Sequence, residues 1–334
     1  MILSCVIIAR NEERNVARCI ESVLACTEHI KNREIILVDS CSSDRTVAIA
    51  KHYAINIIGL NPSWKLSPSA GRFCGISNVS GTYVFVIDAD MEVLKGWIDV
   101  AMDFLINNHN VAAVVGRQYD VYYDSFGKQS QPRIGKNSKG QDKLKRIKYV
   151  HQSCLFRRAS LMKAGNFQPF LKAEEEAEVS YRLRKIGYDL FYLPFDSIFH
   201  YSILRDSFQE TKRRIKNGLY EGCGDMMKWA LQNRYYPLIW DRFKVFLLFI
   251  FLIGISFVCS IYFFLTNQLL HFLIFVSSPV IFILFMAIKK KNIHYGLLSA
   301  LNISIISLEL IKGFYRTIPS INYYPKDVVW IKRV

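Results

Sequence analysis

Two long uncharged segments in the last third constrain what this chain can fold into. Residues Val245–Leu265 contain no charged residue over 21 positions, and Leu269–Ile288 contain none over 20. As helices, both are long enough to cross the hydrocarbon core of a bilayer. Only three residues, Thr266-Asn267-Gln268, separate them, so we expect a helical hairpin within a membrane region at 242–334.

Basic residues next to these segments predict their orientation. Arg242 and Lys244 precede the first segment and three lysines, 289–291, follow the second. Since cytoplasmic loops are enriched in Lys and Arg, both ends of the hairpin are expected in the cytoplasm. Residues 294–312 are apolar at first but carry Asn302, which leaves a third span or an interfacial helix open. Charge favours the interfacial helix, and the chain is predicted to be a multi-pass inner-membrane protein with a cytoplasmic domain.

The first 205 residues alternate between two kinds of segment. Strands are predicted at Leu3–Ala9, Glu34–Val38, Asn56–Ile58, Val84–Asp90, Val111–Gly116, His151–Phe156 and Asp189–Leu193. Helices are predicted at Val16–Leu24, Arg45–His52, Ser69–Val79, Trp97–Asn107 and Arg158–Ala164, with another that ends at Gly187. This alternation is typical of βαβ units and predicts an α/β domain with a mainly parallel sheet at 1–205.

Two polar stretches connect these predicted elements. Residues 119–148 are rich in Gly, Ser, Lys and Gln and predict a long loop. His200 is expected in a loop after the last strand of the domain. Residues 206–241 are basic and partly amphipathic, which predicts an interfacial helical linker to the membrane region.

The strand predicted at Val84–Asp90 ends in two carboxylates, Asp88 and Asp90. Ligands bind at the carboxyl ends of strands in open α/β sheets. If the strand stays extended, both side chains share one face. Paired carboxylates suit Mg²⁺ or Mn²⁺, which in turn bind a diphosphate. An acidic turn with no ligand is the simpler interpretation of these two residues alone.

The net charge of +15 raises the question of a nucleic-acid partner. The basic residues are not gathered in one tract, and no nucleic-acid-binding module is recognisable, so we expect none. Their position beside the apolar segments fits an anionic membrane surface better. The eight cysteines form no CxxC pair, which predicts reduced thiols.

Several motifs occur together in the order and at the spacing of one family. They are Val6–Glu13, Val38–Thr46, Asp88–Asp90 and Glu175–Val179 with Arg182, followed by Gly187, Tyr188, Pro194 and His200. Through this joint order the chain resembles glycosyltransferase family 2, the inverting enzymes with a GT-A fold, over residues 1–205. The apolar hairpin resembles bacterial members that build surface polysaccharides.

The resemblance implies a nucleotide-sugar site at the start of the domain. Ala9, Arg10 and Glu12 match the loop that borders the base and ribose. Asp39 matches the acid that hydrogen-bonds the base, often uracil. Arg72 matches a basic residue near the diphosphate, although Phe73 stands where the family usually has Asn.

The resemblance also implies a metal site and a catalytic base. Asp90 matches the direct ligand of Mg²⁺ or Mn²⁺, Asp88 lies near the metal and ribose, and His200 matches a position near the metal or diphosphate. Glu176 matches the catalytic base, where the family usually has Asp. This longer side chain leaves Glu175, or a water-bridged arrangement, open as the base.

The acidic run 174–178 permits two interpretations of its own. Clustered carboxylates raise one another's pKa, which suits a base, whereas acids at a helix N-terminus also simply favour the helix dipole. Glu178 and Arg182, spaced i,i+4, are expected to form an ion pair. Asp44 is expected to cap a turn rather than to bind a ligand.

The predicted function is transfer of a sugar, from a UDP-linked nucleotide sugar, to a lipid-linked (polyprenyl-type) or glycan acceptor at the cytoplasmic membrane face. One addition per encounter is expected, since few spans make a poor export conduit. Two alternatives stay open. A non-catalytic scaffold that binds nucleotide sugars is one, and a nucleotidyltransferase is the other, although residues 9–12 are not a Gly-rich phosphate loop.

Overall fold

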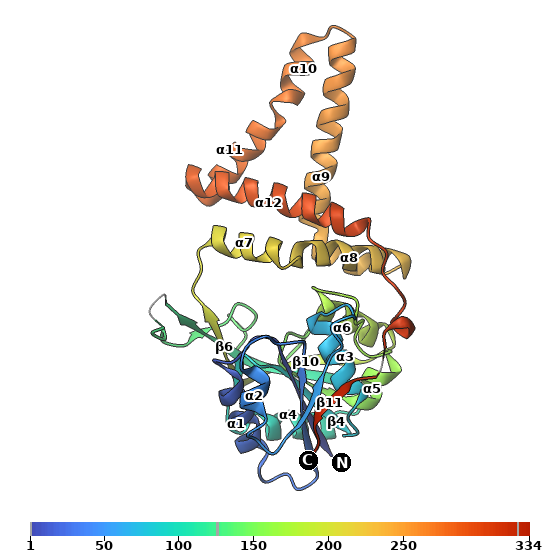
Figure 1. Cartoon of the computed structure of the whole chain (residues 1–334). Helices are drawn as coiled ribbons and strands as arrows, with labels where there is room; N and C mark the ends of the chain where they lie inside the picture. Colours follow the sequence, from blue (N-terminus) through green and yellow to red (C-terminus); the bar gives the residue numbers. More distant parts are fainter. Residues whose placement is uncertain (1, 125–126, 326) are drawn as a thin grey trace. The chain divides into compact units, whose positions relative to one another are not determined.

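The computed structural model describes residues 2–124, 127–325 and 327–334, which divide into two compact units (Figure 1). The first unit contains the chain up to Asp206 together with Pro319–Val334. The second unit, Ser207–Ile318, is helical. All eight cysteine thiols are free.

The first unit is built on a mixed sheet. Its strands are β1 Leu3–Ala9, β2 Arg33–Asp39, β3 Asn56–Gly59, β4 Tyr83–Asp88, β5 Met91–Val93, β6 Val111–Tyr123, β7 Arg133–Ile134, β8 Lys145–Arg146, β9 Cys154–Arg157, β10 Asp189–Ile203 and β11 Val329–Lys332. Their order is β11-β3-β2-β1-β4-β9-β6-β10-β5, with β7 on β6 and β8 on β10. Strands β3, β2, β1 and β4 are parallel to one another, whereas β9 runs antiparallel between β4 and β6. The predicted α/β class with a mainly parallel core is confirmed.

Helices cover both faces of this sheet. They are α1 Val16–Thr27, α2 Thr46–Ala50, α3 Pro68–Ser77, α4 Trp97–Asn107, α5 Arg158–Lys163 and α6 Glu175–Lys185. Helix α3 begins with Ser67, whose hydroxyl accepts from the backbone N–H of Ala70, and with Pro68 in the first turn. Gly187, with φ +96°, follows the end of α6 in the left-handed conformation predicted there.

Strands β1 and β4 form the centre of the core. All seven residues of β1 are buried, and so are the first five residues of β4. Continuous apolar runs of this kind are expected where helices cover both faces of a parallel sheet. The polar residues that follow each run are therefore placed at the rim of the sheet.

Several predicted boundaries were wrong, because pairing with neighbouring strands overrides local composition. The strand at 84–90 ends at Asp88, and Ala89 and Asp90 form a turn before β5. Strand β6 continues to Tyr123, into the predicted loop. His200 lies within β10 rather than in a loop, opposite Asp120 of β6 and Met91 of β5.

The chain end adds a strand that the sequence analysis did not predict. Strand β11 pairs antiparallel with β3 at the edge of the sheet, where Figure 1 shows the red C-terminal segment. The segment before it contains Tyr324, which is 2% exposed and contacts the rings of Trp64, Phe73 and Phe170. The Tyr324 hydroxyl donates to the carbonyl of Lys65 at 3.0 Å. This segment therefore secures the loop before α3.

The second unit contains the apolar helices. They are α7 Ser207–Lys216, α8 Leu219–Gln232, α9 Tyr236–Leu265, α10 Leu269–Val276, α11 Ser278–Lys290 and α12 Ile293–Phe314. Helices α9 and α12 are long and apolar enough to cross a membrane. The segment predicted as one span at 269–288 is two helices, α10 and α11, with a bend of 43° between them. Helix α12 lies along α8, with Gly224 and Gly313 at a backbone-to-backbone contact.

Replacing Tyr324 with alanine should lower the free energy of unfolding by about 3 kcal/mol, because a buried aromatic ring leaves a cavity. Tyr323→Ala is the matched control, since Tyr323 is 78% exposed and its loss should cost less than about 0.5 kcal/mol. Urea denaturation of the full chain in detergent, followed by tryptophan fluorescence, measures both. Equal effects of the two substitutions would contradict a structural role for the C-terminal segment.

Candidate active site

The site is organised around Arg72, a cation that α3 holds inside the protein. Its side chain is only 2% exposed. Its Nη1 donates to Glu175 Oε1 at 2.6 Å, and its Nη2 donates to Asp88 Oδ1 at 2.9 Å. The same Nη2 lies 3.1 Å from Glu176 Oε1. One guanidinium thus joins the end of β4 to the first turn of α6.

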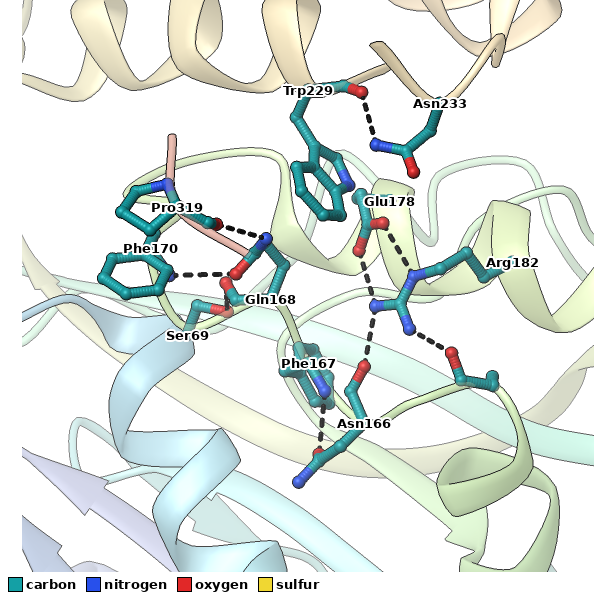
Figure 2. A network of polar contacts seen from close by, with 11 residues as sticks. Ser69, Asn166, Phe167, Gln168, Phe170, Glu178, Arg182, Trp229, Asn233 and Pro319 are labelled. Carbon is teal, nitrogen blue, oxygen red and sulfur yellow. Dashed lines mark hydrogen bonds and ion pairs between the residues drawn. The ribbon is translucent and has the colours of Figure 1, made fainter. Parts of the chain in front are cut away.

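Polar contacts around Arg182 hold α6, which carries the two glutamates, in place, and Figure 2 draws this network. Arg182 makes the predicted ion pair with Glu178, at 2.7 Å from Nε to Oε1 and 2.6 Å from Nη2 to Oε2. Its Nη2 also donates to the carbonyl of Asn166 at 2.7 Å. Asn166 in turn donates through Nδ2 to the carbonyl of Phe73, the residue after Arg72. These bonds therefore connect α6 to α3 through the 164–170 loop.

The same loop is also bonded to the start of α3. Ser69 donates to the carbonyl of Gln168 at 2.7 Å, and Ser67 donates to the carbonyl of Pro169 at 2.7 Å. Gln168 donates to the carbonyl of Pro319, the first residue of the C-terminal segment, at 3.4 Å (Figure 2). The position of Arg72 is thus set by contacts from three distant parts of the first unit.

Three carboxylates on one guanidinium cannot all be ionised without repulsion. Burial raises the pKa of Glu175 to about 8, Glu176 adds to the rise and Arg72 opposes it. Burial also raises the pKa of Asp88 to about 7. Arg72 lowers this pKa, and nearby Asp90 raises it. The pKa of Glu175 is thus raised as predicted, but burial is the main cause and the neighbouring acid Glu176 comes second.

Asp90, His200 and Asp120 form a second cluster beside the first. His200 Nε2 lies 3.4 Å from Asp90 Oδ2, and His200 Nδ1 lies 3.1 Å from Asp120 Oδ1. Burial lowers the pKa of His200, but hydrogen bonds to Asp120 and Asp90 outweigh it and raise the pKa to about 10. In this arrangement His200 is a cation between two carboxylates.

The donor set fits a divalent cation only in part. Within the described residues, no three His, Cys, Asp or Glu side chains converge as a complete metal site. Asp90 Oδ1, however, is buried and makes no hydrogen bond. Mg²⁺ and similar ions are commonly held by one or two carboxylates together with substrate phosphates, so one free carboxylate oxygen suffices from this side. A protonated His200 cannot ligate a metal until it loses its proton.

The first loop lies at the rim of the same sheet. Ala9 ends β1, Arg10 is exposed, and Glu12 donates its backbone N–H to Thr46 at 2.8 Å. Burial and nearby Asp90 raise the pKa of Glu12 to about 7. Glu12 is therefore close to the Asp90 cluster, whereas Arg10 faces solvent.

Asp39, at the end of β2, keeps one oxygen without a partner. Its Oδ2 accepts from the backbone N–H of Ser42 at 3.0 Å, but its Oδ1 is buried and makes no hydrogen bond. A buried carboxylate oxygen without a donor is costly, unless a ligand supplies one. Asp44 accepts from the backbone of Glu13 and Thr46, as expected of a turn residue.

The structure adds His151 and Ser153 to the site. The sequence analysis predicted both residues to lie in a strand. His151 and Ser153 precede β9, whose first residue pairs with Val86, so they lie at the same rim as Asp88. Both ring nitrogens of His151 and the Ser153 hydroxyl are buried without a partner. Burial lowers the pKa of His151 to about 4, so its ring is neutral. The sequence signal for these site residues is the run of three polar residues, 151–153, directly before an apolar strand.

Two further observations place this segment near Glu176. The backbone N–H of Val150 donates to Ser180, on α6, at 3.0 Å. Burial raises the pKa of the Cys154 thiol, and nearby Glu176 adds to the rise. The residues from 150 to 154 therefore lie between α6 and the end of β4.

Comparison with known proteins supports the family resemblance. Residues 4–165 match the family model described as glycosyl transferase family 2. The chain is 27% identical over 202 residues to the O-antigen chain rhamnosyltransferase WbaN of Salmonella anatum, covering 57% of this chain and 63% of that protein. It is 28% identical over 185 residues to the minor teichoic acid biosynthesis protein GgaA of Bacillus subtilis (strain 168), covering 53% and 42%. The chain therefore spans less than two thirds of either relative.

A solved structure shares the fold. It is the crystal structure of S. aureus TarS 1–349 in complex with UDP-GlcNAc. The structural match covers 95% of this chain and 93% of the TarS chain. The TM-score is 0.54 at 14% sequence identity. The family-model match confirms the predicted resemblance to glycosyltransferase family 2, and the structural match supports the predicted GT-A fold.

Glu175 should make stability depend on pH. Its pKa is about 8 in the folded protein against 4.5 ordinarily, so the folded state binds more protons between these values. The free energy of unfolding therefore falls as pH rises through this range, and the fall should be smaller in Glu175→Gln. Urea denaturation in EDTA at pH 5 and pH 8 measures it, with the exposed Glu28→Gln as control. Parallel pH profiles for wild type and Glu175→Gln would refute the assignment.

Proposed function

We propose that this chain is an inverting, metal-dependent glycosyltransferase. The proposal starts from the match of residues 4–165 to glycosyltransferase family 2. The enzyme moves a sugar from a UDP-linked donor to a lipid-linked or glycan acceptor in polysaccharide biosynthesis. The observation that carries the proposal is Arg72, whose Nη2 contacts both Asp88 and Glu176. This contact brings the β4 end, where a donor diphosphate would bind, next to the acids of α6.

The donor site follows from the strand ends. Asp39 Oδ1, buried and unpaired, would accept the N3–H of a uracil base. Ala9, Arg10 and Glu12 border the same rim, beside the ribose. The UDP-GlcNAc in the TarS structure is consistent with this choice of nucleotide.

The departing diphosphate needs its developing charge neutralised. Asp90, through its free Oδ1, would hold Mg²⁺ or Mn²⁺ together with the diphosphate oxygens. A cation held there would supply Lewis-acid stabilisation of the leaving group. Arg72 lies beside this position, and Asp88 and His200 complete the charged surroundings.

Glu176 is the better base of the two candidates. Its side chain is 18% exposed, whereas that of Glu175 is 6% exposed and accepts a hydrogen bond from Arg72. Glu176 takes the proton of the acceptor hydroxyl as this oxygen attacks the anomeric carbon, and the bond from that carbon to the diphosphate oxygen breaks. One base opposite one leaving group gives inversion in a single displacement.

The neutral His151 and the hydroxyl of Ser153 would orient the reacting sugar. Their unpaired polar atoms lie between Glu176 and the end of β4. Sugar hydroxyls both donate and accept, so they would satisfy either tautomer of His151. In this role both side chains position the sugar and take part in no chemical step.

The helical unit supports a membrane location. The bent pair of α10 and α11 would act as one span and would form a hairpin with α9 in the inner membrane. The transferase domain would then lie in the cytoplasm. Helix α12 packs along α8, which carries Glu221, Asp225 and Lys228, so we assign α12 to the interface rather than to a third span. This arrangement keeps a lipid-linked acceptor near the catalytic domain and supports one addition per encounter.

Asp90→Ala and Glu176→Gln should each reduce Mn²⁺-dependent release of UDP in the presence of acceptor at least about 100-fold. The control is Asp103→Asn, an exposed carboxylate on α4 that should release UDP at the wild-type rate. A panel of UDP-sugars with lipid-linked acceptors, read by mass spectrometry, measures the release. Unchanged release in both variants would overturn the mechanism, and no release by wild type with any donor would favour a binding scaffold.

Asp39→Ala should raise the KM for a UDP-sugar about tenfold while kcat changes little, because one hydrogen bond to the base is lost in ground and transition states alike. The same substitution should leave KM and kcat unaltered for a poorer donor that carries another base. Steady-state kinetics with a UDP-sugar and the matched CDP-sugar checks this, because N3 of cytosine carries no hydrogen for Asp39 to accept. A fall in kcat alone would place Asp39 outside the base site.

A further inference from the structure

A hollow of about 600 Å³ lies in the first unit beside strands β5, β6 and β10. None of the predicted site residues lines it. Its lining consists of Leu94, Lys95, Arg117, Tyr119, Pro132, Pro194, Phe195, Asp196 and Phe199. The residues combine aromatic rings, prolines and charged groups, a mixture that differs from an ordinary apolar crevice.

An irregularity in β10 creates the aromatic part of the hollow. The register between β10 and β6 shifts between Tyr192 and Asp196, and again between Asp196 and Ile198. Bulges of this kind redirect side chains, and here Phe195 is 36% exposed. The rings of Tyr119 and Phe199 lie 5.8 Å apart on the adjoining strands. The bulge thus adds an exposed ring to an existing aromatic pair.

Polar groups between these rings are held in fixed positions. Arg117 Nη1 lies 3.0 Å from Asp196 Oδ1, and the Tyr119 hydroxyl donates to the same oxygen at 3.0 Å. The hollow therefore offers guanidinium, hydroxyl and carboxylate groups that hold one another in fixed positions.

The hollow and the reaction centre lie on different faces of these strands. Phe199 pairs with Tyr119, and the next pair along is His200 with Asp120. Successive side chains of a strand point to opposite faces. Since His200 contacts both Asp120 and Asp90, the aromatic pair faces away from the proposed metal and donor site.

We propose that this hollow is a second glycan-binding site, which holds sugar units of the acceptor or product chain remote from the reacting end. Sugar rings have an apolar C–H face that packs on aromatic rings, and hydroxyls that pair with guanidinium and carboxylate groups. A few fixed polar groups in an aromatic hollow of this size suit a short oligosaccharide, whereas a stable protein interface needs a larger surface. The assignment of the glycan as acceptor or product rests on the proposed transferase function.

The test is direct binding of polysaccharide by the full chain in detergent. The probes are delipidated O-antigen polysaccharide and wall teichoic acid, immobilised on a glycan array. We expect wild type to bind at least one of them, and Phe195→Ala to bind it roughly five- to tenfold more weakly. Phe195→Trp should keep the binding, because a larger ring preserves the stacking surface.

Tyr323→Ala is the control, an exposed aromatic residue elsewhere in the same unit whose loss should leave binding unchanged. Phe195→Ala should also keep the wild-type rate of UDP release by donor hydrolysis without acceptor. Failure of wild type to bind either probe, or equal binding by Phe195→Ala and wild type, would overturn the second site. UDP release by Phe195→Ala is independent of this result, so failure of the glycan site and failure of the transferase function are distinguishable.

Discussion

The arrangement of the catalytic domain depends on one buried cation. Arg72 binds Asp88, at the end of β4, and both glutamates at the start of α6. A buried guanidinium is stable only when its charge is compensated, and the carboxylates around it are stable only near a cation. Each group therefore requires the others, and their mutual requirement fixes the distance between strand end and helix.

The surroundings of Arg72 explain why so much of the chain is devoted to holding it. The Glu178–Arg182 pair, Asn166 and the serines that begin α3 connect the helices around it. The C-terminal segment packs Tyr324 against Phe73, the neighbour of Arg72 in the chain. A residue that in the sequence departs from the family pattern, Phe73, thus forms part of the contact surface for the returning chain end.

The sequence predicted what short-range patterns encode and missed what long-range pairing adds. The apolar run of β1, the carboxylates at the end of β4 and the ion pair of Glu178 with Arg182 follow from local composition and spacing. The strand position of His200, its contact with Asp120 and the pairing of β11 with β3 depend on neighbours far along the chain. The unpaired nitrogens of His151 likewise become visible only when the residues around them are placed. The roles of Asp90, Glu176 and Asp39 in transfer stay predictions.

The central claim is that donor diphosphate, metal and base meet at one side of Arg72. Anomalous diffraction from crystals of the full chain, grown with UDP and Mn²⁺, tests it most directly. The account predicts a manganese peak against the carboxylate of Asp90, with the diphosphate beside Arg72, and with Glu176 on the same side of the sheet. A manganese peak elsewhere, or a diphosphate bound with Glu176 on the far side of the sheet, would contradict it.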